Sequence, residues 1–178
     1  MMNNITFEPL KDTDLQYACQ LYEEAFPIEE RRDTSEWLLQ NKQNPLFNIL
    51  CIKQNQTFQG ILSYWTFESF HYIEHFAISA QQRGNGIGCA ALELFMTTRT
   101  QYPIILEVEP DVNDTTHRRI LFYNKHRFHI IEHPYLQPSY HKGGSPFALN
   151  IMCNDVNFAN HNFNNIVRTI HQQVYHYK

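Results

Sequence analysis

The sequence predicts a mixed α/β fold of three layers, with helices on both faces of a central mixed sheet of about six or seven strands. Three apolar runs, at residues 46–53, 57–67 and 71–79, follow one another with connections of three residues, which predicts an antiparallel meander. A glycine-rich loop, a helix-forming segment and the apolar run 103–109 come next. That order predicts a β-α-β unit whose last strand is covered on both faces.

The helices before the meander are predicted from local signals. A helix should begin after a cap at Asp12 or Asp14 and run to about Phe26, because apolar residues recur there near the helical period. Pro27 ends it, and a second, shorter helix is predicted over 29–40. Elsewhere the pattern predicts strands at 5–9, 128–132 and 146–152 and helices at 89–100 and 116–127.

Length and composition indicate one globular domain. The chain has 178 residues, of which 43% are hydrophobic and 18% are charged, and a chain of this length buries about 70% of its unfolded surface. We expect a domain over residues 1–153 and a C-terminal extension over 154–178, packed on or near it. In that extension Ile166, Val167 and Ile170, with Val174, are spaced like one face of a helix.

Charge and cysteine usage limit the partners and the compartment. The formal net charge is −4, so the chain has little bulk attraction for nucleic acid or for an anionic membrane. The four cysteines are far apart, with no C-x-x-C, which favours reduced thiols. No run approaches the ~18 apolar residues of a membrane helix, and the first residues do not resemble a secretory signal. We therefore expect a cytoplasmic protein, a monomer or homodimer, with no nucleic-acid or membrane partner.

Residues 81–88, QQRGNGIG, carry the strongest chemical signal. The preceding run is a predicted strand and the following one a predicted helix. A helix N-terminus has unpaired N–H groups and a partial positive charge, and glycines let an anion approach the backbone. The segment therefore predicts a phosphate cradle.

A dinucleotide fold is one alternative. Gly86, Gly88 and Ala91 fit G-x-G-x-x-[GA], and Glu107 and Glu109 lie where a ribose-binding carboxylate would be expected. However, three antiparallel runs precede this loop, whereas an NAD-binding fold has its glycines after the first strand of a parallel set. A P-loop is excluded because no Lys-Ser or Lys-Thr follows the glycines.

A zinc hydrolase is a second alternative, because His71, Glu74 and His75 spell H-x-x-E-H. That motif requires a helix. On the predicted strand, alternation sends Glu74 to the face opposite His71 and His75. We therefore expect no metal.

The segment Arg83-Gly84-Asn85-Gly86-Ile87-Gly88 fits [RQ]-x-x-G-x-[GA] at each fixed position, and Phe76-Ala77-Ile78 precedes it. A later helix ends in Phe122-Tyr123-Asn124-Lys125-His126-Arg127-Phe128. Together these resemble the coenzyme A loop, its preceding strand and the F/L-Y-x-x-x-G-F helix of the GNAT superfamily of acyl-CoA N-acyltransferases. The resemblance covers Ile5 to Met152. It departs at Arg127, where the family usually has glycine. A residue other than glycine pays roughly 1–2 kcal/mol to adopt the left-handed conformation of a helix cap. We therefore expect this corner to differ in shape. The resemblance also departs at Thr116, where asparagine is common.

The resemblance implies an N-acetyltransferase that moves an acetyl group from acetyl-CoA to a primary amine of a small molecule or a protein. The backbone of Arg83, Gly84, Asn85, Gly86, Ile87 and Gly88 would hold the pyrophosphate, and that of Phe76, Ala77 and Ile78 would pair with the pantetheine arm. Tyr123 would protonate the leaving thiolate.

The base and the acceptor site remain open at this point. Glu74 is the favoured base, but Glu107, Glu109 or water are alternatives. Carboxylates, among them Glu29 and Glu30, would give an acceptor pocket acidic character, lined by Tyr135 and Tyr140. A coenzyme-binding regulatory member of the same fold is the alternative from a non-enzyme class.

Overall fold

The computed structural model describes residues 4–177, which form eight strands and five α-helices with three short 3₁₀ turns. The chain divides into two compact units, with the division between Tyr102 and Pro103. The predicted domain limit at residue 153 stays a prediction.

The sheet of the first unit is an antiparallel meander, as predicted. Its strands are β1 (Ile5–Pro9), β2 (Phe47–Gln54), β3 (Thr57–Thr66) and β4 (His71–Ile78), paired in the order β1-β2-β3-β4. All three pairings are antiparallel. The connections are too short for crossovers, so neighbours in sequence become neighbours in the sheet.

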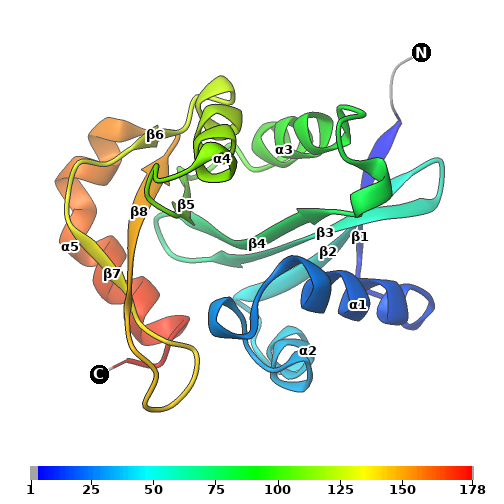
Figure 1. Ribbon diagram of the computed structural model, residues 1–178, viewed down its shortest axis with the longest axis horizontal. Coiled ribbons are helices and arrows are strands. Elements are labelled where there is room, and N and C mark those ends of the chain that lie inside the picture. The colour runs from blue at the N-terminus through cyan, green and yellow to red at the C-terminus, as the bar shows by residue number, and fades with distance from the viewer. Residues whose placement is uncertain (1–3, 178) are drawn as a thin grey trace. The chain divides into compact units, whose positions relative to one another are not determined.

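Helices cover both faces of this sheet (Figure 1). The helices α1 (Leu15–Ala25) and α2 (Thr34–Gln43) lie on one side, and α3 (Ile87–Thr98) lies on the other. On the first side Tyr22 stacks on Trp37 with ring centroids 4.1 Å apart. On the second side Phe95 packs edge-on against Tyr64 of β3. The sheet therefore has one apolar layer above it and one below.

Two predictions about the first helices are wrong. The second helix begins at Thr34, after a 3₁₀ turn at Ile28–Glu30, because the segment before Asp33 is extended rather than helical. No side chain caps α1. The Asp14 carboxylate instead forms an ion pair with Lys53, 3.0 Å away.

An irregularity in the β3–β4 register changes the faces of β4. Ser63 lies opposite His75, but the next residue, Tyr64, lies opposite Ile73, so Glu74 is the extra residue of a bulge. Simple alternation is lost at that point.

The predicted faces of the histidines are therefore only partly right. His71 contacts Tyr64, on the α3 side. His75 contacts Tyr22 of α1, and Glu74 binds Arg32, whose backbone N–H donates to the Tyr22 hydroxyl. The Glu74 and His71 side chains therefore point to opposite faces of the sheet, as predicted, but Glu74 and His75 point to the same face.

The second unit contains four strands and two helices. They are β5 (Ile104–Val108), α4 (Asp114–Lys125), β6 (His129–Ile130), β7 (Tyr135–Gln137), β8 (Phe147–Cys153) and α5 (Val156–Gln173). Strand β8 pairs antiparallel with β5, β6 and β7. Strand β7 lies in a segment that was predicted to be a loop. The described residues therefore form eight strands, whereas six or seven were predicted.

The terminal helix is confirmed, and three of the four residues of its predicted face are buried, whereas Val167 is half-buried. Within α5 Ile166 and Ile170 are fully buried, as is Val174 just beyond it. The Asp155 side chain caps the helix by accepting a hydrogen bond from the Phe158 N–H, at 2.9 Å.

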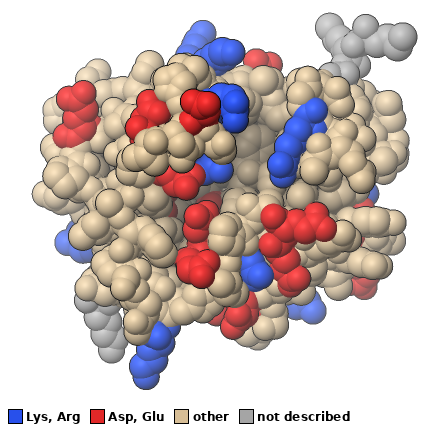
Figure 2. All heavy atoms as spheres, in the orientation of Figure 1, with Lys and Arg blue, Asp and Glu red and all other residues tan. Residues whose placement is uncertain are grey.

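Among residues 4–177, every helix falls short of the length and apolar character that crossing a membrane requires. Acidic and basic side chains are interspersed on the face that Figure 2 shows. That face carries mixed charge rather than a field of one sign.

Candidate functional site

The glycine-rich loop forms a turn that opens helix α3. Gly84 and Gly86 have φ angles of 81° and 77°, in the left-handed region that glycine reaches without strain. Gly86 is the N-cap residue of α3, and its end of the helix has no side-chain cap. The first N–H groups of α3 therefore have no side-chain acceptor from the cap position.

The space around this backbone is open. A Cβ atom built on Gly84 or Gly86 would meet nothing within 4 Å. Exposed N–H groups beside open space at a helix N-terminus are the structural requirement for binding a phosphate or pyrophosphate. The loop therefore fits the diphosphate of a coenzyme.

The loop is joined to the end of strand β4. The Arg83 Nε–H donates to the Ile78 carbonyl at 3.1 Å. Gly60 of β3 approaches β4 so closely that a Cβ there would lie 2.4 Å from the Ala77 carbonyl oxygen. In the predicted pantetheine strand Ala77 is buried, whereas Phe76 and Ile78 are half-exposed. The two predicted coenzyme-binding segments are thus adjacent.

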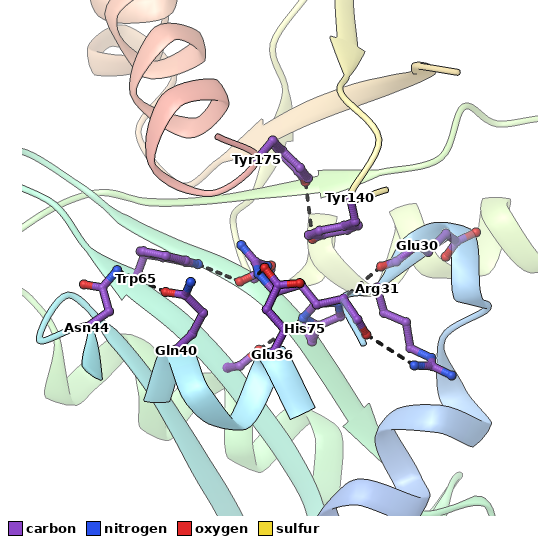
Figure 3. A network of polar contacts seen from close by, with 12 residues as sticks. Glu30, Arg31, Glu36, Gln40, Asn44, Trp65, His75, Tyr140 and Tyr175 are labelled. Atoms are coloured by element: carbon purple, nitrogen blue, oxygen red, sulfur yellow. Dashed lines mark hydrogen bonds and ion pairs between the residues drawn. The ribbon is translucent and has the colours of Figure 1, made fainter. Parts of the chain in front are cut away.

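Glu74 is held in a buried polar network. One carboxylate oxygen binds the Arg32 guanidinium, and the other accepts a hydrogen bond from the Trp65 Nε1–H at 2.6 Å. The side chains of Arg32 and Glu74 are 2% and 0% exposed. Figure 3 shows Trp65 and His75 within this network. Arg32 could not be identified from the sequence, because no local signal relates it to a residue 42 positions away.

His75 is a neutral partner of this network. Burial lowers its pKa to about 4, against the smaller opposing effect of Glu74. Its Nε2 lies 3.3 Å from the Glu30 carbonyl, which can only accept, so Nε2 carries the proton. Nδ1 then accepts from the Ser63 hydroxyl at 3.2 Å.

The H-x-x-E-H sequence has no metalloprotease geometry. It lies on strand β4, whereas the motif needs two histidines one helical turn apart. Within the described residues, no three His, Cys, Asp or Glu side chains are grouped so that they could hold a metal ion.

In the second unit, Tyr123 lies on α4 with 9% of its surface exposed. Burial raises its pKa to about 12, against a smaller opposing effect of Arg119. Its ring packs edge-on against Phe122 and Phe128. Its hydroxyl makes no hydrogen bond with another residue of the range 4–177. The phenol is therefore protonated and able to donate.

Thr116 stabilises the start of α4. Asn113 caps the helix, and the Thr116 hydroxyl accepts hydrogen bonds from the N–H groups of Val112 and Asn113, both at 3.1 Å. This capping box uses the hydroxyl at the position where many GNAT members have asparagine.

The corner after α4 keeps its usual shape, which corrects the prediction for Arg127. This residue has φ of 66°. Its N–H donates to the Asn124 carbonyl, and the Phe128 N–H donates to the Tyr123 carbonyl. These are the two bonds of a Schellman motif, so an arginine adopts the left-handed conformation that glycine usually supplies.

Glu107 of β5 forms the centre of a second polar cluster. One carboxylate oxygen accepts from the Tyr135 hydroxyl, and the other accepts from the Tyr175 hydroxyl at 2.8 Å. Tyr140 lies 3.5 Å from Tyr175, oxygen to oxygen. Burial and then the charge of Glu107 raise the pKa of Tyr135 above its usual range. Three predicted acceptor residues are thus grouped, with a fourth residue that the sequence analysis missed.

The other predicted acceptor residues are separate from these clusters. Glu109 forms an exposed ion pair with Arg119. Glu29 is exposed on the 3₁₀ turn before α2, and the neighbouring Glu30 is half-exposed.

Comparison with known proteins is consistent with this geometry. The sequence model described as "Acetyltransferase (GNAT) family" matches residues 15–128. A solved structure, "Putative acetyltransferase from GNAT family from Bacteroides thetaiotaomicron", is 31% identical, with a TM-score of 0.91 over 97% of this chain and 99% of that one. This likeness confirms the predicted three-layer α/β fold.

Two further comparisons are more limited. "Putative acetyltransferase YjbC" of Bacillus subtilis (strain 168) is 31% identical over 109 residues, which are 59% of this chain and only about half, 53%, of that relative. The ribosomal-protein-S18-alanine N-acetyltransferase of Escherichia coli is 19% identical, with a TM-score of 0.61 over 84% of this chain and 92% of that one, and shows the fold alone. The matched family and the shared fold establish that this chain belongs to the GNAT family of acetyltransferases.

Proposed function

We propose that this protein transfers an acetyl group from acetyl-CoA directly to a primary amine. The observation that carries the proposal is the open glycine backbone at the start of α3, joined through Arg83 to strand β4. In acetyl-CoA the diphosphate lies some distance from the thioester, so a cradle next to a strand suits this cosubstrate. The thioester supplies the activated acetyl group, and the protein supplies binding and proton transfer.

Coenzyme binding is assigned to the backbone. The N–H groups of residues 84–88 would bind the diphosphate, with help from the partial positive charge of the α3 N-terminus. The polar backbone of Phe76 to Ile78 would bind the pantetheine arm as an added strand does.

Tyr123 is proposed as the general acid. Its raised pKa keeps the proton on the oxygen at working pH, and a phenol gives it up once the sulfur carries charge. No residue of the described range 4–177 accepts the proton of this hydroxyl, so the hydroxyl is available to a bound thiolate.

The base is proposed to be one of three carboxylates or water. Glu74 remains the residue predicted from its strand position. Because its side chain is buried and both oxygens have partners, a proton would reach it through water rather than directly. Glu107 is half-exposed and accepts two phenolic hydrogen bonds, and Glu109 directly follows the last residue of the same strand.

The acceptor is proposed to be a cationic primary amine of a small molecule or a protein. Glu107 would attract the ammonium group, with Tyr135 and Tyr140 beside it and Glu29 and Glu109 adding negative charge.

The test is a panel of amines with acetyl-CoA, in which release of the coenzyme thiol is followed. The panel would contain spermidine, free lysine, an aminoglycoside and peptides with free N-termini. Release that depends on one of these amines supports the proposal. Release with none of them, or equal release without amine, would contradict it.

Coenzyme binding is tested separately by melting temperature. Acetyl-CoA should raise it and NAD should not, because only a ligand of the folded state stabilises that state. Gly86→Val should abolish the acetyl-CoA shift. Gly143→Val is the matched control, because Gly143 also has positive φ, 81°, and open space around it but lies outside the loop. Equal loss of the shift in both variants would mean that strain, not the cradle, explains the effect.

A further inference from the structure

Residues 174–177, which follow α5, make several backbone hydrogen bonds within the second unit. After α5, the N–H groups of Val174 and Tyr175 donate to the Ile170 carbonyl, and the N–H of Tyr177 donates to the His171 carbonyl. Between them His176 has φ of 53°, a conformation that costs most residues free energy and that surrounding contacts must maintain. The last turn therefore directs Tyr175 inward.

The Tyr175 hydroxyl joins two polar side chains from different strands. It donates to the Glu107 carboxylate at 2.8 Å and accepts from the Gln137 amide at 2.6 Å. Since an amide N–H can only donate, the Tyr175 oxygen accepts from Gln137 and its own proton is donated to Glu107. Tyr140 adds a third contact, which Figure 3 shows as a dashed line between the two tyrosines.

Burial makes this arrangement rigid. Tyr175 and Gln137 are 8% and 6% exposed, whereas Glu107 itself remains half-exposed. The His171 ring nitrogen also lies 3.0 Å from the Leu136 carbonyl, which ties α5 to β7. A buried, ordered donor next to a partly exposed carboxylate fixes that carboxylate in one orientation.

Part of these contacts lies outside the segment that the family model matches. That match ends at residue 128, so Gln137 and Tyr175 come from segments beyond it. An apolar core would serve stability alone at least as well as a buried polar network, which is costly unless every member is satisfied.

We propose that Tyr175 is a positioning residue of the acceptor site, holding Glu107 in the orientation in which it binds the ammonium group of the acceptor amine. This inference rests on the proposed function. It makes the turn at residues 174–177, beyond α5, a functional part of the enzyme.

The test compares Tyr175→Phe with Tyr177→Phe. The first variant keeps the ring that packs on Tyr140, with centroids 4.8 Å apart, and removes only the hydroxyl. The second removes a hydroxyl from a ring that is 60% exposed in the same turn. With the best amine of the panel, Tyr175→Phe should lower kcat/KM for the amine about tenfold, the usual effect of losing one hydrogen bond to a charged group. The KM for acetyl-CoA and the acetyl-CoA melting shift should stay unchanged, and Tyr177→Phe should match wild type.

Two further measurements separate positioning from folding. Gln137→Leu leaves Tyr175 intact but removes the amide that orders its hydroxyl, so it should change the same kinetic constant by about threefold. In a Glu107→Gln background, Tyr175→Phe should add little, because both changes remove one interaction.

The outcomes are distinct. If Tyr175→Phe retains the wild-type constants, or if its effect multiplies fully with that of Glu107→Gln, the inference is overturned. A parallel loss of acetyl-CoA binding and amine turnover also overturns it, because that pattern indicates a purely structural tyrosine. A different outcome is that wild type binds acetyl-CoA but no amine of the panel makes it release thiol. In that case the proposed function is wrong, and the inference, which rests on it, is wrong as well.

Discussion

Replacing Glu74 of β4 by glutamine tests how much the buried polar network of Glu74, Arg32 and Trp65 stabilises the first unit. The variant keeps the shape of the side chain and the acceptor for Trp65, but it leaves the Arg32 guanidinium without its carboxylate. Removing one partner of a buried ion pair costs about 3–5 kcal/mol, because the remaining charge stays desolvated. Arg32 keeps a distant contact with Glu36, at 4.0 Å, and its position over the Trp65 ring, 5.7 Å from the centroid. We therefore expect the lower end of the range.

The loss is large for a chain of this size. Domains are stable by about 5–15 kcal/mol, and each kcal/mol moves the melting temperature of a 150–250-residue chain by about 2–4 °C. Glu74→Gln should therefore melt roughly 6–12 °C below wild type if the loss is about 3 kcal/mol. Both tryptophans, Trp37 and Trp65, lie in the first unit and are fully buried, so urea denaturation followed by their fluorescence reports this unit.

The matched control is Glu24→Gln on α1. Its carboxylate is exposed and accepts from Gln20 at 2.7 Å, so its loss should change stability by no more than about 0.5 kcal/mol. The double variant Arg32→Met with Glu74→Gln should recover most of the loss, because no buried charge remains. If Glu74→Gln and Glu24→Gln lower the free energy of unfolding equally, the buried ion pair does not stabilise the first unit.

Three other predictions concern catalysis and pH. Tyr123→Phe should lower kcat by about 10²–10⁴-fold, with a smaller effect on the KM for acetyl-CoA; unchanged turnover would make it a packing residue. The pH profile of kcat/KM for the amine is compared among Glu74→Gln, Glu107→Gln and Glu109→Gln. The variant that lacks the base should lose the rise of the profile at low pH. Three unaltered profiles would indicate that water takes the proton. Because His75 has a folded pKa of about 4 against an unfolded value of 6.5, the unfolded state binds the proton first as pH falls. Stability should thus fall between pH 6.5 and 4 by about 3 kcal/mol from this group, and His75→Asn should reduce that slope in urea titrations; an unchanged slope would contradict the neutral assignment.

Local sequence signals were enough to predict much of the fold. The meander follows from short connections between apolar runs, and the start of α3 follows from glycines placed after a strand. The turn at residues 83–88 was predictable for the same reason, because its glycines supply the conformation that opens α3. Arg127 shows the limit of residue preference, because helix geometry and two backbone hydrogen bonds impose a left-handed corner on a residue that disfavours it.

Tertiary structure decided the surroundings of the carboxylates. The sequence by itself determined that Glu74 and Glu107 lie on strands, but a one-residue bulge decided that His75 faces the same side of the sheet as Glu74. Their partners come from 42 and 68 residues away in the chain. A strand's period describes only its own faces, whereas an ion pair or a tyrosine hydroxyl is delivered by whichever distant segment folds against it. For that reason Arg32 and Tyr175 could be recognised only once the chain was folded.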